Sequence, residues 1–119
     1  LALPLTPDTT GIIGRAELAR MQPHAVLVNV ARGAHVVTDD LLAALRAGTI
    51  AAAALDVTDP EPLPDDHPLW SEPRCLVTPH TANTEEMAEP LLAARVADNV
   101  RRWASGEPLL GPVDPAAGY

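Results

Sequence analysis

The sequence predicts an α/β fold in which helices cover a parallel sheet. Three short apolar runs, at residues 25–30, 50–57 and 75–78, have the length and composition of buried strands. A helical pattern joins the first run to the second, and such a crossover makes the two strands parallel. We therefore expect a three-layer arrangement, with the sheet between helices and a long C-terminal helix after it.

The chain before the first strand contains one short predicted helix. Residues 1–7 have the pattern of a strand that is ending in a loop. A helix is expected over residues 14–21, because Leu18 and Met21 fall on one face and Pro23 closes the segment.

The predicted crossover helix has clear signals at both ends. Thr38 is expected to cap its start, with Asp39 and Asp40 in the first turn. Gly48 follows its last turn, where glycine commonly ends a helix. A long proline- and aspartate-rich connection over residues 58–74 separates the second strand from the third, and loops of this length tend to be functional.

The last predicted helix begins near Thr84 and runs to about Ala104, before Gly106. Pro90 either kinks this helix or marks its true first turn. The spacing of its apolar residues gives one face, formed by Leu91, Leu92, Val96, Val100 and Trp103. We expect one domain over residues 1–106, followed by an irregular tail over 107–119.

Composition excludes some classes of function. The 119 residues carry a formal net charge of −8, which argues against binding to nucleic acid or to an anionic membrane surface. No apolar run is long enough to span a membrane. Cys75 is the only cysteine, which favours a reducing cytoplasm, and its apolar neighbours indicate a small buried hydrophobe rather than a nucleophile.

Three polar side chains lie at or just after the ends of the predicted strands. Arg32 follows the first, Asp56 ends the second and His80 follows the third. If the strands are parallel, all three emerge at the same edge, where open α/β sheets bind ligands. The other histidines (His24, His35 and His67) lie in turns or loops and receive no role.

Each of these three residues, and Glu61 in the long loop, has two interpretations on the sequence pattern alone. Arg32 either holds a carboxylate by two hydrogen bonds or pairs with a surface acid. His80 is an acid/base or a structural histidine. Glu61, between two prolines, either orients an imidazole and favours its protonated form or is an ordinary loop acid. Asp56 accepts hydrogen bonds from a ligand or caps a helix. No spacing of histidines or acids indicates a metal site.

Taken together, five segments resemble the D-isomer-specific 2-hydroxyacid dehydrogenases, in that family's order and spacing. They are LPLTPDT at residues 3–9, LVNVARG at 27–33, AALDV at 53–57, EPLP at 61–64 and TPHTA at 78–82. The resemblance implies a Rossmann-like fold, the second half of a doubly wound dinucleotide-binding domain. It implies hydride transfer between NAD or NADP and a small 2-oxo or 2-hydroxy acid.

The resemblance also implies roles for individual residues. Arg32 would bind the substrate carboxylate, His80 would be the acid/base, and Glu61 would pair with His80. Asp56 would accept from the nicotinamide carboxamide. The remaining residues expected to line the dinucleotide are Leu3, Pro4, Val30, Ala31, Thr81, Ala82 and Asn83, together with Arg32 and His80. Many members have an acid where this chain has Val37, so Thr38 is left to cap the helix.

The sequence lacks two features of a complete dinucleotide site. No Gly-x-Gly-x-x-Gly phosphate loop occurs in it, and no downstream acid is placed to hold the adenosine ribose. We therefore expect a fragment of a longer enzyme, inactive in isolation, whose parent forms a homodimer. The alternatives are a non-catalytic module that senses dinucleotide or binds a protein, and an inactive truncated product.

Overall fold

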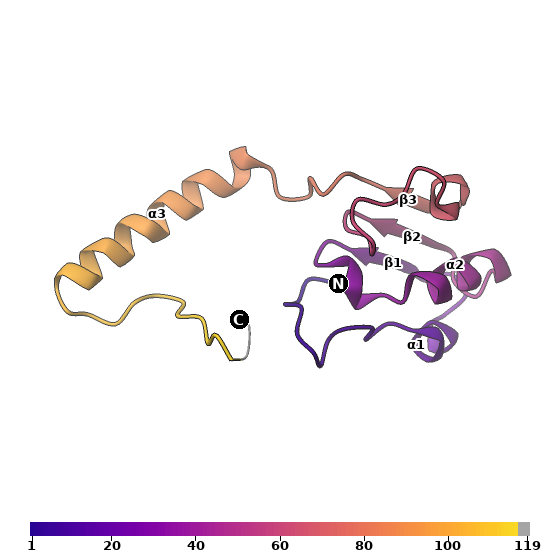
Figure 1. Cartoon of the computed structure of the whole chain (residues 1–119), viewed down its shortest axis with the longest axis horizontal. Helices are drawn as coiled ribbons and strands as arrows, with labels where there is room; N and C mark the ends of the chain where they lie inside the picture. Colours follow the sequence, from indigo (N-terminus) through magenta and orange to yellow (C-terminus); the bar gives the residue numbers. More distant parts are fainter. Residues whose placement is uncertain (117–119) are drawn as a thin grey trace. The chain divides into compact units, whose positions relative to one another are not determined.

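The computed structural model describes residues 1–116. It divides into two compact units, the first spanning Leu1–His80 and the second beginning at Thr81. The first unit contains the sheet and the second contains one long helix (Figure 1). The domain boundary expected at residue 106 stays a prediction.

The sheet has the predicted strands in the predicted arrangement. Its strands are β1 (Val26–Asn29), β2 (Ala52–Leu55) and β3 (Cys75–Val77), in the order β1-β2-β3, and both pairs are parallel (Figure 1). Each strand is shorter than the apolar run that predicted it. Backbone hydrogen bonds continue past the strand ends, because Asp56 N donates to Asn29 O (2.9 Å) and Thr78 N donates to Leu55 O (2.9 Å).

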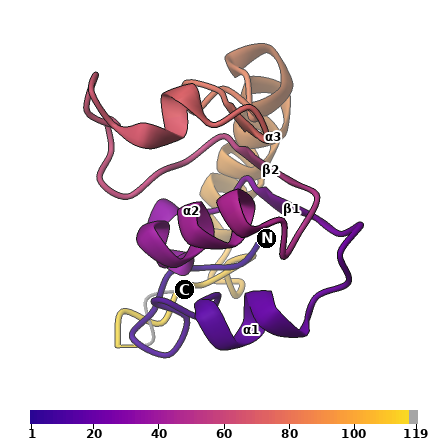
Figure 2. The same ribbon diagram turned by 90° about the vertical axis from the view of Figure 1, so that its right-hand side faces the viewer.

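The first unit has two α-helices, α1 (Arg15–Arg20) and α2 (Thr38–Ala47), which pack side by side (Figure 2). Gly48 ends α2 in the left-handed conformation, with φ of 69°, as predicted. The expected cap at the start of α2 is wrong. Val37 occupies the N-cap position without a side-chain bond, and the Thr38 hydroxyl instead donates to Asp59 O at 2.7 Å.

Two short 3-10 helices, η1 (Gly33–His35) and η2 (Pro68–Ser71), lie in the connections that follow β1 and β2. Both lie in segments for which the sequence predicts irregular loops. The η1 turn comes directly after Arg32, so it fixes the chain's path on leaving the sheet.

One apolar core holds α1, α2 and the sheet together. Leucines supply most of it, since the first unit contains no phenylalanine and β2 is rich in alanine. Its fully or almost fully buried members are Leu18, Leu27, Val36, Leu41, Leu42, Ala44, Leu45, Ile50, Ala53, Leu55, Leu63 and Leu69. Burying this surface is the main favourable term for the unit.

The opposite face of the sheet is apolar and open to solvent. Val28, Ala54 and Leu76 are aligned across the three strands, and Val28 and Leu76 are 47% and 62% exposed. The alternation along β1 is therefore exposed-buried-exposed-buried. The α/β class and the parallel sheet are confirmed, with the helices of this unit gathered on one face.

The second unit contains α3 (Glu85–Ala104). The predicted cap is confirmed, since the Thr84 hydroxyl accepts from Met87 N at 3.3 Å. Pro90 lies inside α3, beyond its first turn, so the prediction that it marks the true start is wrong. No helix among residues 1–116 is both long and apolar enough to cross a membrane. Residues 117–119 of the expected tail lie outside the described residues.

Candidate active site

The carboxyl ends of the three strands bring the predicted polar residues to one edge of the sheet. Asn29 and Val77 pair with the same residue of β2, so the ends of β1 and β3 are level. Arg32 and His80 each follow three residues beyond these level ends, and Asp56 follows β2 directly. The parallel arrangement thus confirms the common edge on which the functional interpretation depends.

Arg32 lies in a tightly held turn but has an exposed side chain. The amide of Asn29, which is fully buried, donates to Arg32 O at 2.9 Å and accepts from Ala31 N at 3.1 Å. The guanidinium donates to Ala31 O at 2.7 Å. Among residues 1–116 it forms no ion pair with a carboxylate, so the surface-acid pairing considered for Arg32 is not observed.

Gly33 is needed for packing between two loops. A Cβ built on it would lie 1.9 Å from Thr58 O and 2.6 Å from Asp59 N. On sequence alone, a glycine directly after Arg32 predicts that a ligand can approach the backbone closely. The structure corrects this, because the space beside Gly33 is filled by the loop that follows β2.

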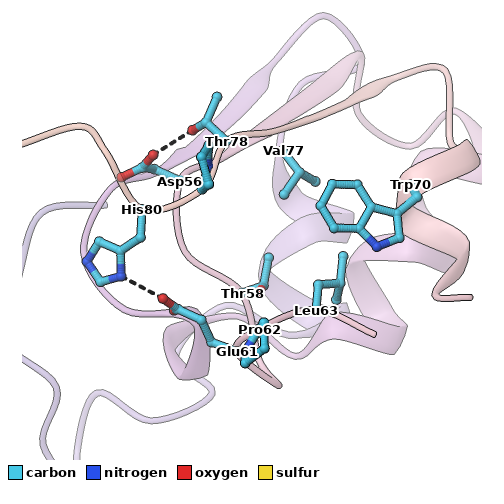
Figure 3. Close-up of a pocket in the computed structure, with 10 residues that line it drawn as sticks. Asp56, Thr58, Glu61, Pro62, Leu63, Trp70, Val77, Thr78 and His80 are labelled. Carbon is cyan, nitrogen blue, oxygen red and sulfur yellow. Dashed lines mark hydrogen bonds and ion pairs between the residues drawn. The ribbon is translucent and has the colours of Figure 1, made fainter. Parts of the chain in front are cut away.

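His80 and Glu61 form a close polar pair at this edge. His80 Nδ1 lies 2.6 Å from Glu61 Oε1, and the two side chains are 48% and 41% exposed (Figure 3). The His80 backbone has φ of 54°, in the left-handed region that residues other than glycine seldom adopt. Such outliers cluster at functional sites. A carboxylate at Nδ1 fixes the orientation of the ring and directs Nε2 away from it.

Asp56 is buried, at 6% exposure, and contacts the next strand. The Thr78 hydroxyl donates to Asp56 Oδ1 at 2.6 Å (Figure 3). No helix begins at Asp56, so the helix-capping interpretation is wrong. The bond to Thr78 instead links the carboxyl ends of β2 and β3.

A cavity of about 190 Å³ adjoins the His80–Glu61 pair. Figure 3 shows the indole of Trp70, with Leu63 and Val77, on its apolar side, opposite the imidazole. The indole N–H donates to Pro64 O at 2.8 Å, which fixes the ring. Sequence reasoning did not single out Trp70, although it is the only aromatic residue of the long loop over residues 58–74.

The segment at the start of the chain, which the sequence predicts to be the end of a strand, is not a strand in the structure, but its first residue bonds to β1 and its flank. The Leu1 amino group donates to Val28 O, and Val30 N donates to Leu1 O at 3.2 Å, in the pattern of a parallel ladder. Of the residues predicted to line the dinucleotide, Leu3, Pro4, Val30 and Ala31 therefore belong to this region. Thr81, Ala82 and Asn83 belong to the second unit, and their role stays a prediction.

The chemistry of Cys75 agrees with a structural role. Burial of the thiol, helped by the nearby carboxylate of Glu72, raises the pKa of Cys75 to about 11. The thiol is therefore protonated near neutrality and is a poor nucleophile. Among the described residues, no three histidine, cysteine, aspartate or glutamate side chains are grouped so that they could hold a metal ion.

Comparison with known proteins identifies the family. Residues 1–82 match the family model described as "D-isomer specific 2-hydroxyacid dehydrogenase, NAD binding domain". The chain is 47% identical over 117 residues to glyoxylate/hydroxypyruvate reductase A of Escherichia fergusonii, covering 98% of this chain and 37% of the relative. It is 52% identical to an uncharacterised protein of Corynebacterium melassecola, covering 100% and 39%. The chain thus spans well under half the length of these relatives.

Solved structures agree with the sequence comparison. A D-isomer specific 2-hydroxyacid dehydrogenase of Xanthobacter autotrophicus Py2, in complex with NADPH and MES, aligns with a TM-score of 0.86 and 46% identity, covering 99% of this chain and 48% of that one. A glyoxylate/hydroxypyruvate reductase of Sinorhizobium meliloti, with NADP and sulfate, aligns with a TM-score of 0.88 and 38% identity, covering 99% and 38%. The chain belongs to the D-isomer specific 2-hydroxyacid dehydrogenase family.

Proposed function

We propose that this chain supplies the catalytic edge of an NAD(P)-dependent reductase of small 2-oxo acids such as glyoxylate or hydroxypyruvate. The observation that carries the proposal is the His80–Glu61 pair, at 2.6 Å, on the same sheet edge as an arginine without an acidic partner among residues 1–116. An acid/base and a carboxylate anchor are the two groups that reduction of a 2-oxo acid requires from a protein. The names of the relatives support the same substrate class.

The chemistry of this edge fits a nicotinamide dinucleotide. Asp56 places a buried carboxylate at the carboxyl end of β2, and each carboxylate oxygen can accept more than one hydrogen bond. A carboxamide N–H is a donor that such a carboxylate accepts, as it accepts the Thr78 hydroxyl at Oδ1. When bound, the nicotinamide supplies the hydride for C2 of the substrate.

The remaining steps are performed by side chains of this chain. The Arg32 guanidinium binds the substrate carboxylate by two parallel hydrogen bonds and so orients the 2-oxo group. His80 donates the Nε2 proton to the carbonyl oxygen as the hydride reaches C2, which converts C=O to CH–OH. Glu61 keeps the ring in the orientation that this transfer needs. Solvent then returns a proton to the half-exposed imidazole.

A chimera tests the proposal with the chain as it exists. The part of the E. fergusonii reductase that precedes the matched segment is fused to residues 1–119, and NADPH oxidation is followed with glyoxylate and with hydroxypyruvate. Turnover is expected, and His80→Gln should lower kcat by about 10²–10⁴-fold. His24→Gln, which changes an exposed histidine before the amino end of β1, is the matched control and should leave the activity unchanged.

Two outcomes would contradict the proposal. A folded chimera that binds NADPH without turnover would favour the non-catalytic sensing module. Equal activity of the His80→Gln and wild-type chimeras would remove His80 from the reaction. A homodimer of the longer protein and a cytoplasmic location stay predictions that accompany this proposal.

A further inference from the structure

His35 is a fully buried histidine to which the proposed reaction gives no role. Its exposure is 0%, and it is one of three buried polar or charged residues of the described chain. From its position in the sequence, His35 is expected to be a loop histidine without a role. The structure instead places its ring between two loops, with Nδ1 2.9 Å from Arg32 O and Nε2 3.1 Å from Pro4 O.

Both contacts of the ring are to backbone carbonyl groups, which only accept hydrogen bonds. A neutral imidazole donates to one of them and an imidazolium donates to both. In each state at least one ring N–H holds a loop in place. The bond to Pro4 spans 31 residues of sequence, so the ring ties the first segment of the chain to the turn after β1.

The turn in question is the one that carries Arg32. Besides its contact with the His35 ring, the Arg32 carbonyl oxygen accepts from the Asn29 amide at 2.9 Å and from His35 N at 3.2 Å. The Arg32 backbone is therefore fixed by two buried side chains on its inner side, while its guanidinium remains exposed. Because the guanidinium projects from this turn, rotation of the peptide group would displace it from the catalytic edge.

We propose that His35 is a positioning residue for Arg32. The contacts of its ring with Arg32 O and Pro4 O form a clamp, which holds the Arg32 peptide group against the segment that contains Pro4. The proposal rests on the proposed function, since it assigns His35 to the carboxylate anchor of the same site. Loss of the clamp raises KM for the substrate more than it lowers kcat, because His80 and Glu61 lie on other loops.

The chimera separates this role from simple core packing. His35→Phe fills the space without any ring donor, and it should raise KM for glyoxylate about 10-fold, the scale of one hydrogen bond, with kcat changed less. His35→Gln restores an N–H donor and should recover most of that loss. Ile50→Ala, a fully buried change at the amino end of β2, controls for lost stability and should leave KM unchanged when assayed below its Tm.

A double-mutant cycle gives the decisive comparison. In an Arg32→Ala background, His35→Phe should raise KM no further, because the residue acts through Arg32. Additive effects would overturn the proposal, as would an unchanged KM in a folded His35→Phe chimera. Inactivity of the unmutated chimera would instead reject the proposed function.

The clamp itself has a readout that does not depend on activity. In the 119-residue chain labelled with 15N-histidine, His35 should show a ring N–H that exchanges slowly with solvent, unlike exposed His24. Rapid exchange of the His35 ring protons in the folded chain would show that the clamp does not form.

Discussion

His80 and Glu61 are 19 residues apart in the sequence, and their Nδ1 and Oε1 atoms are 2.6 Å apart in the structure. Each comes from a different connection, Glu61 from the loop after β2 and His80 from the turn after β3. The loop of Glu61 is in turn packed against the turn of Arg32, since Thr58 lies where a side chain at Gly33 would be. The catalytic edge is thus built from the connections that follow β1, β2 and β3. The connection after β2 contacts both of the others.

Replacement of Glu61 by glutamine should lower kcat of the chimera by about 100-fold or more, because an amide at Nδ1 no longer fixes the tautomer and orientation of the ring. Binding of NADPH should not change. Asp66→Asn, an exposed acid of the same loop, is the control and should retain full activity. Steady-state kinetics with glyoxylate decide the matter, and equal values for the two variants would make Glu61 an ordinary loop acid.

Gly33→Ala should destabilise the first unit by about 3 kcal/mol or more, because the added Cβ would meet backbone atoms at 1.9–2.6 Å that cannot move alone. Gly14→Ala is the comparison: its Cβ would meet only side-chain atoms at 3.6–3.7 Å, and a cost under about 1 kcal/mol is expected. Denaturant unfolding measures both. Similar stabilities would mean that the Thr58 loop does not pack on Gly33.

The parts of the fold that could be predicted are those governed by local patterns. The strands and their parallel order follow from the apolar runs and the crossover helix, and the caps at Gly48 and Thr84 follow from residue type. Thr38 failed as a cap because α2 begins one residue earlier than expected, with Val37 as its N-cap, and the Thr38 hydroxyl donates to a tertiary acceptor, Asp59 O. Competition of this kind is invisible in the sequence.

Site residues could be predicted from the sequence where their position at the end of a strand indicated that they lie at the ligand-binding edge. Arg32, Asp56 and His80 satisfy that condition. Asn29 and His35 do not, because their importance comes from carbonyl groups that the fold brings to them, one of which lies 31 residues away. Their structural roles depend on burial, and the residue pattern of the surrounding loop does not show that these polar side chains are buried.

Cys75 should react with iodoacetamide only at alkaline pH, because its pKa is raised to about 11 by burial and by Glu72. The unfolded chain, with the ordinary value of 9.0, loses the thiol proton first. The contribution of Cys75 to stability is therefore fully present below about pH 9 and is lost as the pH rises to about 11. Cys75→Ala should lack this alkaline loss in unfolding measurements. Fast alkylation of the folded chain at pH 7 would contradict the assignment.

The 119-residue chain by itself should not turn over glyoxylate, although it carries His80, Glu61 and Arg32. Its sequence contains no Gly-x-Gly-x-x-Gly loop to hold a pyrophosphate. NADPH oxidation at enzyme concentrations at which the chimera is active provides the test. Clear turnover by the isolated chain would show that the residues present suffice for dinucleotide binding.

Trp70 should report occupation of the cavity beside His80. Its indole lines that cavity and is 53% exposed, so a ligand there changes the polarity around the ring. The chain's other tryptophan is Trp103, and Trp103→Phe leaves Trp70 as the single reporter within residues 1–119. If a relative's segment contributes tryptophan to the chimera, that residue is replaced as well.

Oxalate, a dicarboxylate that cannot be reduced by hydride, should shift the tryptophan emission of the chimera in the presence of NADPH. Arg32→Ala should abolish the shift, because the ligand would lose its carboxylate anchor while the indole keeps its bond to Pro64. An unaltered response in Arg32→Ala would place the carboxylate against some other cation.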